Sequence, residues 1–156
     1  MQPKQAKNLL ALVVVLWAAA PHAQTISVTA ATPLSFGGMA VVNGGSVTVS
    51  PGGSRTASAG IFLLPSAPGT PAQLTVSTTP SSNLSYTVTL PTSTVMTSGY
   101  NQMTVMPLSV APASGTLFIT GSGGTQNILV GGTLNLGSSQ TPGNYAGSFP
   151  LTINYP

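Results

Sequence analysis

The most informative segment for the fold is Gly143-Asn144-Tyr145-Ala146-Gly147-Ser148-Phe149-Pro150-Leu151-Thr152-Ile153-Asn154-Tyr155-Pro156. Its odd-numbered positions from 145 to 155 carry aromatic and aliphatic side chains, apart from one glycine, whereas the even positions are small, polar or proline. A period of two places one set on the core face of a strand and the other set toward solvent. The stretch therefore predicts a β-strand over Tyr145–Tyr155 with one strongly apolar face.

The rest of the chain continues this pattern. Short alternating runs are separated by Gly, Pro, Ser and Asn, and no long run has the 3.6-residue period of a helix, which is typical of an all-β sandwich or barrel. The predicted strands are Thr25–Ala30, Leu34–Phe36, Met39–Val42, Ser46–Ser50, Thr56–Leu64, Ala72–Thr78, Ser85–Leu90, Met103–Val110, Thr116–Thr120, Gln126–Val130, Thr133–Leu136 and Tyr145–Tyr155.

Glycine-rich dipeptides predict the connections. Asn43-Gly44-Gly45 predicts a hairpin between the strands on either side, because such turns need positive φ. Gly131-Gly132 predicts a second tight connection, and the proline-rich stretch 65–71 is a loop by composition. Gly121-Ser122-Gly123-Gly124 lacks the following lysine and helix of a phosphate-binding loop, so we interpret it as a turn.

The first 23 residues have the organisation of a signal peptide. Lys4 and Lys7 form a basic region, and Leu9–Ala20 is an apolar run of 12 residues, too short for a membrane span. Cleavage is predicted after Ala23, which sends the protein to the periplasm and then outside the cell or to its surface. A retained membrane anchor is the alternative.

Cleavage would leave 133 of the 156 residues, with Arg55 as the only charged side chain and with no Asp, Glu, Lys, His or Cys. Without a basic patch, the mature chain offers little to nucleic acid, and no membrane span remains. We expect one β-sandwich domain at 34–156, preceded by a segment, 24–33, that is either an N-terminal extension or the first strand.

The same composition argues against an enzyme. General acid–base catalysis needs a group that titrates near the working pH, and the four tyrosines (Tyr86, Tyr100, Tyr145 and Tyr155) normally titrate near ~10. A serine has no histidine partner, and zinc or calcium would find no His, Cys or carboxylate ligands. We therefore expect no catalytic residue, no metal and no cofactor.

Few single residues suggest a specific role. Arg55, after the Pro51–Ser54 turn, is either a solvated residue or a contact for an anionic surface or for a partner's chain terminus. Met96, Met103 and Met106 are expected to fill gaps in the core. Tyr100, in the Ser98–Asn101 loop, is a candidate for stacking on a sugar.

The final stretch resembles the C-terminal signature of chaperone–usher pilus subunits, through Gly143, Phe149, Leu151, Ile153 and Tyr155. Residues from about 34 to 156 also resemble a group of secreted bacterial domains of unknown function that is close to the spore-coat-U-like and archaic pilin subunits. The segments that carry this second resemblance are Leu34-Ser35-Phe36-Gly37, Val130-Gly131-Gly132-Thr133-Leu134 and Pro142-Gly143-Asn144-Tyr145-Ala146-Gly147.

The resemblance implies an immunoglobulin-like sandwich that lacks one strand, together with a periplasmic chaperone, an outer-membrane usher and further copies or related subunits as partners. It implies a structural subunit of a surface fibre, which polymerises when a neighbour's strand fills the groove by β-augmentation. The candidate donor is Gln24–Thr32, in which Ile26, Val28 and Ala30 alternate with polar or small residues. Pro150 removes one ladder N–H from the final strand and so predicts an edge or a bulge there.

A second interpretation stays open. Gln24–Thr32 is short for a donor and can instead be the domain's own first strand, which would complete the fold. The protein would then be a self-complete secreted surface or matrix domain with an adhesive or sugar-binding role, for which Tyr100, Asn101 and Gln102 are the candidates.

Overall fold

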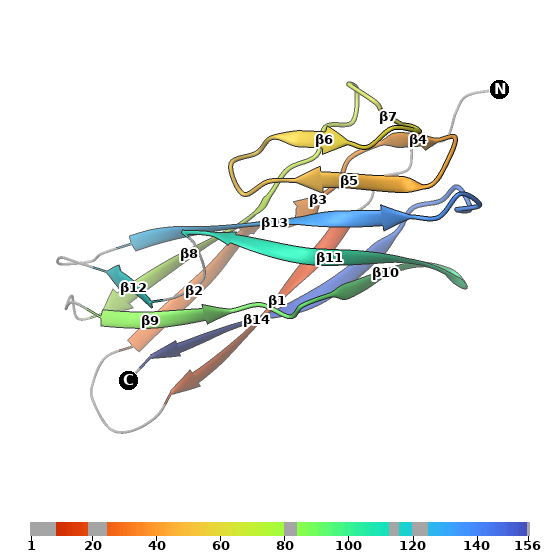
Figure 1. Ribbon diagram of the computed structural model, residues 1–156. Coiled ribbons are helices and arrows are strands. Elements are labelled where there is room, and N and C mark those ends of the chain that lie inside the picture. Colours follow the sequence, from red (N-terminus) through yellow and green to blue (C-terminus); the bar gives the residue numbers. More distant parts are fainter. Residues whose placement is uncertain (1–8, 19–24, 80–83, 113–115, 120–124, 156) are drawn as a thin grey trace.

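A computed structural model of the chain describes residues 9–18, 25–79, 84–112, 116–119 and 125–155. Within these ranges every regular element is a β-strand and there is no helix, which confirms the predicted all-β class (Figure 1). The strands are β1 (Leu9–Ala18), β2 (Thr25–Thr32), β3 (Leu34–Ser35), β4 (Met39–Val41), β5 (Gly45–Val49), β6 (Arg55–Ala57), β7 (Ile61–Leu63), β8 (Ala72–Thr79), β9 (Leu84–Thr89), β10 (Thr94–Ser98), β11 (Asn101–Ala111), β12 (Thr116–Ile119), β13 (Thr125–Leu136) and β14 (Ala146–Tyr155).

Most of these strands belong to one curled, 12-stranded sheet, and β4 and β7 form a small sheet of their own. The main path runs β12-β9-β14-β10-β11-β13-β5-β6, while β1 pairs with β14 and β3, and β8 joins β13 to β2. Figure 1 shows β5, β13 and β11 running across the upper and middle parts of the view and β9, β14 and β1 across the lower part. The result is a β-sandwich-like fold.

The long strand β13 holds the upper part together. Its first half, Thr125–Val130, pairs with β8, and its second half, Gly132–Leu136, pairs with β5. Its other edge pairs with β11, with a shift in register between Val105 and Leu108. A strand that changes partner along its length turns a flat sheet into a curled one, because each partner continues a different part of the surface.

A single core lies inside the curl. It joins side chains of β8 and β13, such as Leu74 and Val130, to side chains of β14, such as Phe149 and Leu151. All four of these side chains are fully buried. With no disulfide and almost no ionic groups, this apolar burial is the main source of stability that the described chain shows.

The predicted hairpin at Asn43-Gly44-Gly45 is wrong. The strand before it, β4, pairs with β7 in the small sheet, whereas the strand after it, β5, pairs with β13 and β6 in the main sheet. Gly44 and Gly45 are also absent from the glycines with positive φ. These residues therefore connect a strand of the small sheet to a strand of the main sheet. This connection needs a change of chain direction but not a tight hairpin turn.

The predicted break at Gly131-Gly132 is also wrong, because both glycines lie inside the continuous strand β13. A Cβ at position 131 would collide with the carbonyl oxygen of Val49 on β5. The glycine is needed for close approach of two backbones at this point, and not for a turn.

Other predictions need smaller changes. The strand predicted over Thr56–Leu64 is two strands, β6 and β7, separated by a turn at Gly60, and β10 was not predicted at all. The turns at 51–54 and 98–101 and the loop at 65–71 are confirmed. The glycine-rich segment 121–124 lies outside the described residues.

In the described ranges, no helix is long and apolar enough to pass through a lipid bilayer.

Candidate functional site: the edge of the C-terminal strand

The apolar face predicted for the final strand is confirmed. Phe149, Leu151 and Ile153 of β14 are fully buried, and Tyr145, which precedes the strand, is almost fully buried. The side chains at positions 148, 150 and 154 are exposed. One face of β14 is therefore part of the core. Other strands can pair with β14 only along its two backbone edges.

One edge of β14 is shared by two strands. Thr97 of β10 pairs with Ala146 at the start of β14, and β9 pairs with Thr152, Ile153 and Asn154 near its end. Pro150 lies in the stretch between these two pairings. A residue without an N–H is tolerated best where the ladder is already interrupted, so the position of Pro150 agrees with the edge or bulge predicted there.

The other edge of β14 is covered by β1. The two strands pair in parallel over ten residues without a shift in register, from Leu9 opposite Ala146 to Ala18 opposite Tyr155. At its start β1 also pairs antiparallel with β3, through Leu34 and Ser35. This strand is part of the apolar run that we interpret as the centre of a signal peptide.

The side chains of β1 alternate between the core and solvent. Leu10 is fully buried in the core cluster, and Leu12 and Val14 are half-buried against it, whereas Val13 is 47% exposed. We call the space beside β14 that Leu10, Leu12 and Val14 fill the β14 groove, whereas Leu16, the next residue on the same face of β1, is 47% exposed. Full burial of a side chain of this size contributes about 1.5–3 kcal/mol.

Gly147 shapes the deepest part of this groove. It lies opposite Leu10 in the ladder, and a Cβ at this position would approach Leu10 Cδ1 to 3.0 Å and collide with the carbonyl oxygen of Val95. The missing side chain leaves the room that Leu10 fills. A larger residue at 147 would therefore close the groove at its deepest point.

The remaining residues of the C-terminal signature have different surroundings. Gly143 precedes β14, is half-buried and lies against Ser98, to whose Oγ a Cβ at 143 would come within 2.8 Å. Tyr155 pairs through its backbone with Ala18, and its side chain lies outside the described part.

The candidate donor segment lies elsewhere in the sheet. It forms β2, which pairs antiparallel with β8, with Ile26 opposite Thr78, Val28 opposite Val76 and Ala30 opposite Leu74. Ile26 is 5% exposed and Val28 is half-buried, while the side chain of Ala30 is not among those described. In the single chain this segment belongs to the main sheet through β8 and does not pair with β14.

Arg55 is not the solvated residue that the sequence suggested. Its Nη2 donates to the carbonyl oxygen of Gly38 at 2.6 Å and its Nη1 to that of Ala67 at 3.2 Å. Its Nε is buried without a hydrogen-bond partner, and burial lowers the pKa of the guanidinium. The side chain ties β6 to the loop after β7 and so acts within the fold.

The described residues contain no other ionic site. Among them, no group of three or more His, Cys, Asp or Glu side chains is placed to hold a metal ion. Burial raises the pKa of Tyr86, whose hydroxyl donates to Gln126 Oε1 at 3.3 Å, to about 12. A phenol held protonated in this way is a structural group.

The strand β1, which is the main feature of the site, was not among the strands predicted from the sequence. The apolar run had been assigned to export alone, although Val13-Val14-Val15 has high β-propensity. That valine run is the signal that could have indicated a strand.

Comparison with known proteins gives one match. A family model described as a domain of unknown function (DUF4402) matches residues 26–155. No curated protein and no solved structure matches the chain.

Proposed function

The chain belongs to the DUF4402 family of domains of unknown function, and from the geometry of its β14 edge we propose that it is a structural subunit of a surface fibre. The subunits assemble by β-strand complementation, in the manner of the chaperone–usher pilus subunits that the C-terminal stretch resembles. The sandwich is of the immunoglobulin-like type and lacks one strand after export.

One observation carries the proposal. The strand that covers the edge of β14, Leu9–Ala18, lies entirely within the 23 residues that we expect signal peptidase to remove. Cleavage after Ala23 takes Leu10, Leu12 and Val14 out of the groove and leaves ten residues of β14 backbone without a partner on that side. An open apolar groove beside an unpaired edge is a template for another strand.

The apolar lining of the groove and the unpaired backbone beside it determine what kind of segment can bind there. The replacement is an extended segment with apolar side chains at every second position, because only alternate residues of β1 enter the core. Ile26, Val28 and Ala30 of a second copy have this spacing, and so would a strand from a periplasmic chaperone that holds the subunit before an outer-membrane usher assembles it. Backbone hydrogen bonds then supply affinity and the alternating side chains supply register.

Composition supports an assembled state. After cleavage Arg55 is the only charged side chain, so repulsion between copies is weak, and association is favoured over a dispersed monomer. The same lack of acids, bases and thiols supports a role that is structural and not enzymatic.

A self-complete surface or matrix domain is the second candidate, and the pairing of β2 with β8 favours it. If Thr25–Thr32 stays in its own sheet, with Ile26 buried, it cannot reach a neighbour. The occupant of the β14 groove would then have to come from another protein, or the groove would stay covered by a retained leader.

Light scattering after size-exclusion chromatography tests the proposal with three chains: residues 1–156, 24–156 and 33–156. We expect a monomer for 1–156 and multimers for 24–156, while a folded 33–156 accepts a strand but donates none and therefore shortens the multimers of 24–156. A folded, monomeric 24–156 would contradict strand exchange. Loss of the β-sheet circular dichroism signal in 33–156 would favour the self-complete domain.

A further inference from the structure

Two adjoining hollows lie at the end of the molecule formed by the β10–β11 turn and the segment between β13 and β14. The deeper one, of about 510 Å³, has an apolar floor that includes Met39, Met103 and Leu136. The shallower one, of about 410 Å³, lies beside Tyr100. Gln140 and Thr141 line both hollows, so the two form one continuous surface, which includes Tyr145 but none of the β14 residues that pair with β1.

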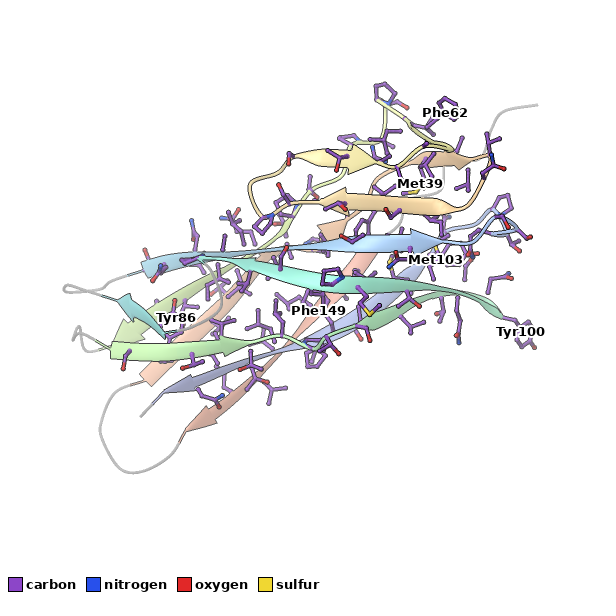
Figure 2. The ribbon with its side chains drawn as sticks, viewed as in Figure 1. Met39, Phe62, Tyr86, Tyr100, Met103 and Phe149 are labelled. Carbon is purple, nitrogen blue, oxygen red and sulfur yellow. The ribbon has the colours of Figure 1, made fainter. Side chains whose placement is uncertain are left out.

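Tyr100 is fully exposed at this site. It occupies the two-residue turn between Ser98 and Asn101, next to Gly99 with φ of 60°. Figure 2 shows it projecting from the tip of the hairpin, at the same end of the molecule as Met39 and Met103. Tyr86 and Tyr145 are buried, so Tyr100 differs in presenting both faces of its ring to solvent. The hairpin ladder nevertheless fixes its backbone.

Uncharged polar groups line the hollow beside Tyr100 and are held in place by hydrogen bonds. Gln140 Nε2 donates to the hydroxyl of Tyr145 at 2.8 Å and to the carbonyl oxygen of Gln102 at 3.3 Å. Thr141 Oγ1 donates to Asn101 Oδ1 at 3.2 Å. These bonds occupy the amide nitrogen of Gln140 and the amide oxygen of Asn101. Gln140 Oε1 and Asn101 Nδ2 make no hydrogen bond to another described residue, and they are an acceptor and a donor beside an exposed aromatic face.

The lining also excludes classes of ligand. No residue of either hollow is Asp, Glu, Lys, Arg or His, so neither an anion nor a cation finds a counter-charge there. A ligand that suits an aromatic ring, an apolar floor and fixed amide groups is uncharged, with both apolar faces and many hydroxyls.

From this geometry we propose that the two hollows form a binding site for a neutral oligosaccharide. One sugar ring stacks on Tyr100, hydroxyl groups bind the amides of Asn101 and Gln140, and the neighbouring sugar residue places its C–H face over Met39 and Met103. The inference does not depend on strand complementation, because it uses none of the residues that pair with β1.

Isothermal titration calorimetry of the full chain, residues 1–156, tests the proposal with neutral tetrasaccharides from cellulose, chitin, starch and xylan as probes. We expect at least one to bind with a Kd of about 1 mM or below. Tyr100→Ala should weaken that binding about tenfold, whereas Tyr100→Phe should keep it, because the ring face remains. Phe62→Ala is the matched control, since Phe62 is another exposed aromatic residue, 63% exposed, that lines neither hollow.

Three results would overturn the proposal. The first is that none of the four tetrasaccharides binds, and the second is that Tyr100→Ala binds as tightly as the unchanged chain. The third is that the neutral apolar dye Nile red binds at the Met39 and Met103 floor and no sugar displaces it, which would assign the site to an apolar ligand.

Discussion

At the residue scale, a few side chains that can carry a charge lie in partly or fully buried surroundings. Arg55 is the clearest example. It is the only charged side chain of the expected mature chain, and its guanidinium donates hydrogen bonds to two backbone carbonyl oxygens within the fold. The two carbonyl oxygens also accept backbone N–H groups, that of Gly38 from Leu64 and that of Ala67 from Gly38, so removing Arg55 takes away the second, charged donor of each.

We expect Arg55→Ala to lower the free energy of unfolding by about 1.5–3 kcal/mol, the range for hydrogen bonds to a charged group. Chemical denaturation followed by circular dichroism measures this. Thr56→Ala, at the exposed neighbouring position on the same strand, is the control and should change stability by less than about 0.5 kcal/mol. If the two variants were equally stable, the hydrogen bonds of Arg55 would not stabilise the fold, and the side chain would behave as a solvated residue.

Tyr86 predicts a loss of stability in alkali. Its pKa is raised to about 12 in the folded chain by burial, against about 10 in the unfolded chain. The stability that this protonated phenol contributes is fully present below about pH 10 and is lost as the pH rises through about 12. Unfolding at a series of alkaline pH values measures the loss.

Tyr86→Phe should make the same curve flatter, because no proton is then released at that buried position. Thr56→Ala, which changes an exposed side chain that carries no titratable group, is the control and should leave the curve as it is. An unchanged alkaline loss in Tyr86→Phe would assign the effect to other groups.

At the element scale, the proposed assembly depends on the pairing of β1 with β14. Leu10 is fully buried between β14 and β3, whereas Val13, three residues later on the same strand, is 47% exposed. The two positions therefore separate the filling of the groove from a general effect of shortening a side chain on β1.

In the chain of residues 1–156, Leu10→Ala should cost about 2–5 kcal/mol of unfolding free energy, as expected for a buried leucine. Val13→Ala should cost less than about 1 kcal/mol. Thermal or chemical denaturation measures both. If the two variants were equally stable, β1 would not be seated in the groove.

The elements also show where sequence reasoning succeeds and fails. The period of two over positions 145–155 predicted β14 and its buried face correctly, because a half-buried strand imposes that alternation directly. The hairpin at Asn43-Gly44-Gly45 failed because turn residues fix a change of direction but not which strands pair afterwards. The interruption at Gly131-Gly132 failed because a close backbone approach needs glycine as much as a turn does.

The candidate site could be predicted only in part. The apolar face of β14 and the candidate donor pattern were visible in the sequence, but their partners depend on long-range pairing that one sequence does not contain. The strand β1 could not be predicted for a different reason. An apolar run that follows basic residues fits the pattern of a signal peptide as well as that of a strand.

At the scale of the whole molecule, the near absence of charge should make stability insensitive to pH. Residues 24–156 contain no Asp, Glu or His, so between about pH 4 and pH 9 folding changes the protonation of almost no group except the termini. We expect the melting temperature of this chain to be constant within about 2 °C over that range. A steep dependence on pH there would point to a titrating partner or to a different mature chain.

In the proposed assembly, the exported chain fills its open β14 edge with a strand from a neighbour. An immunoblot of material sheared from the surface of the native host, with SDS samples loaded boiled and unboiled, tests it most directly. We expect a ladder of multiples in the unboiled lane that collapses to one band on boiling, because strand-linked subunits are held by many backbone hydrogen bonds but by no covalent bond. A single monomer band in both lanes, with the protein plainly present, would contradict it.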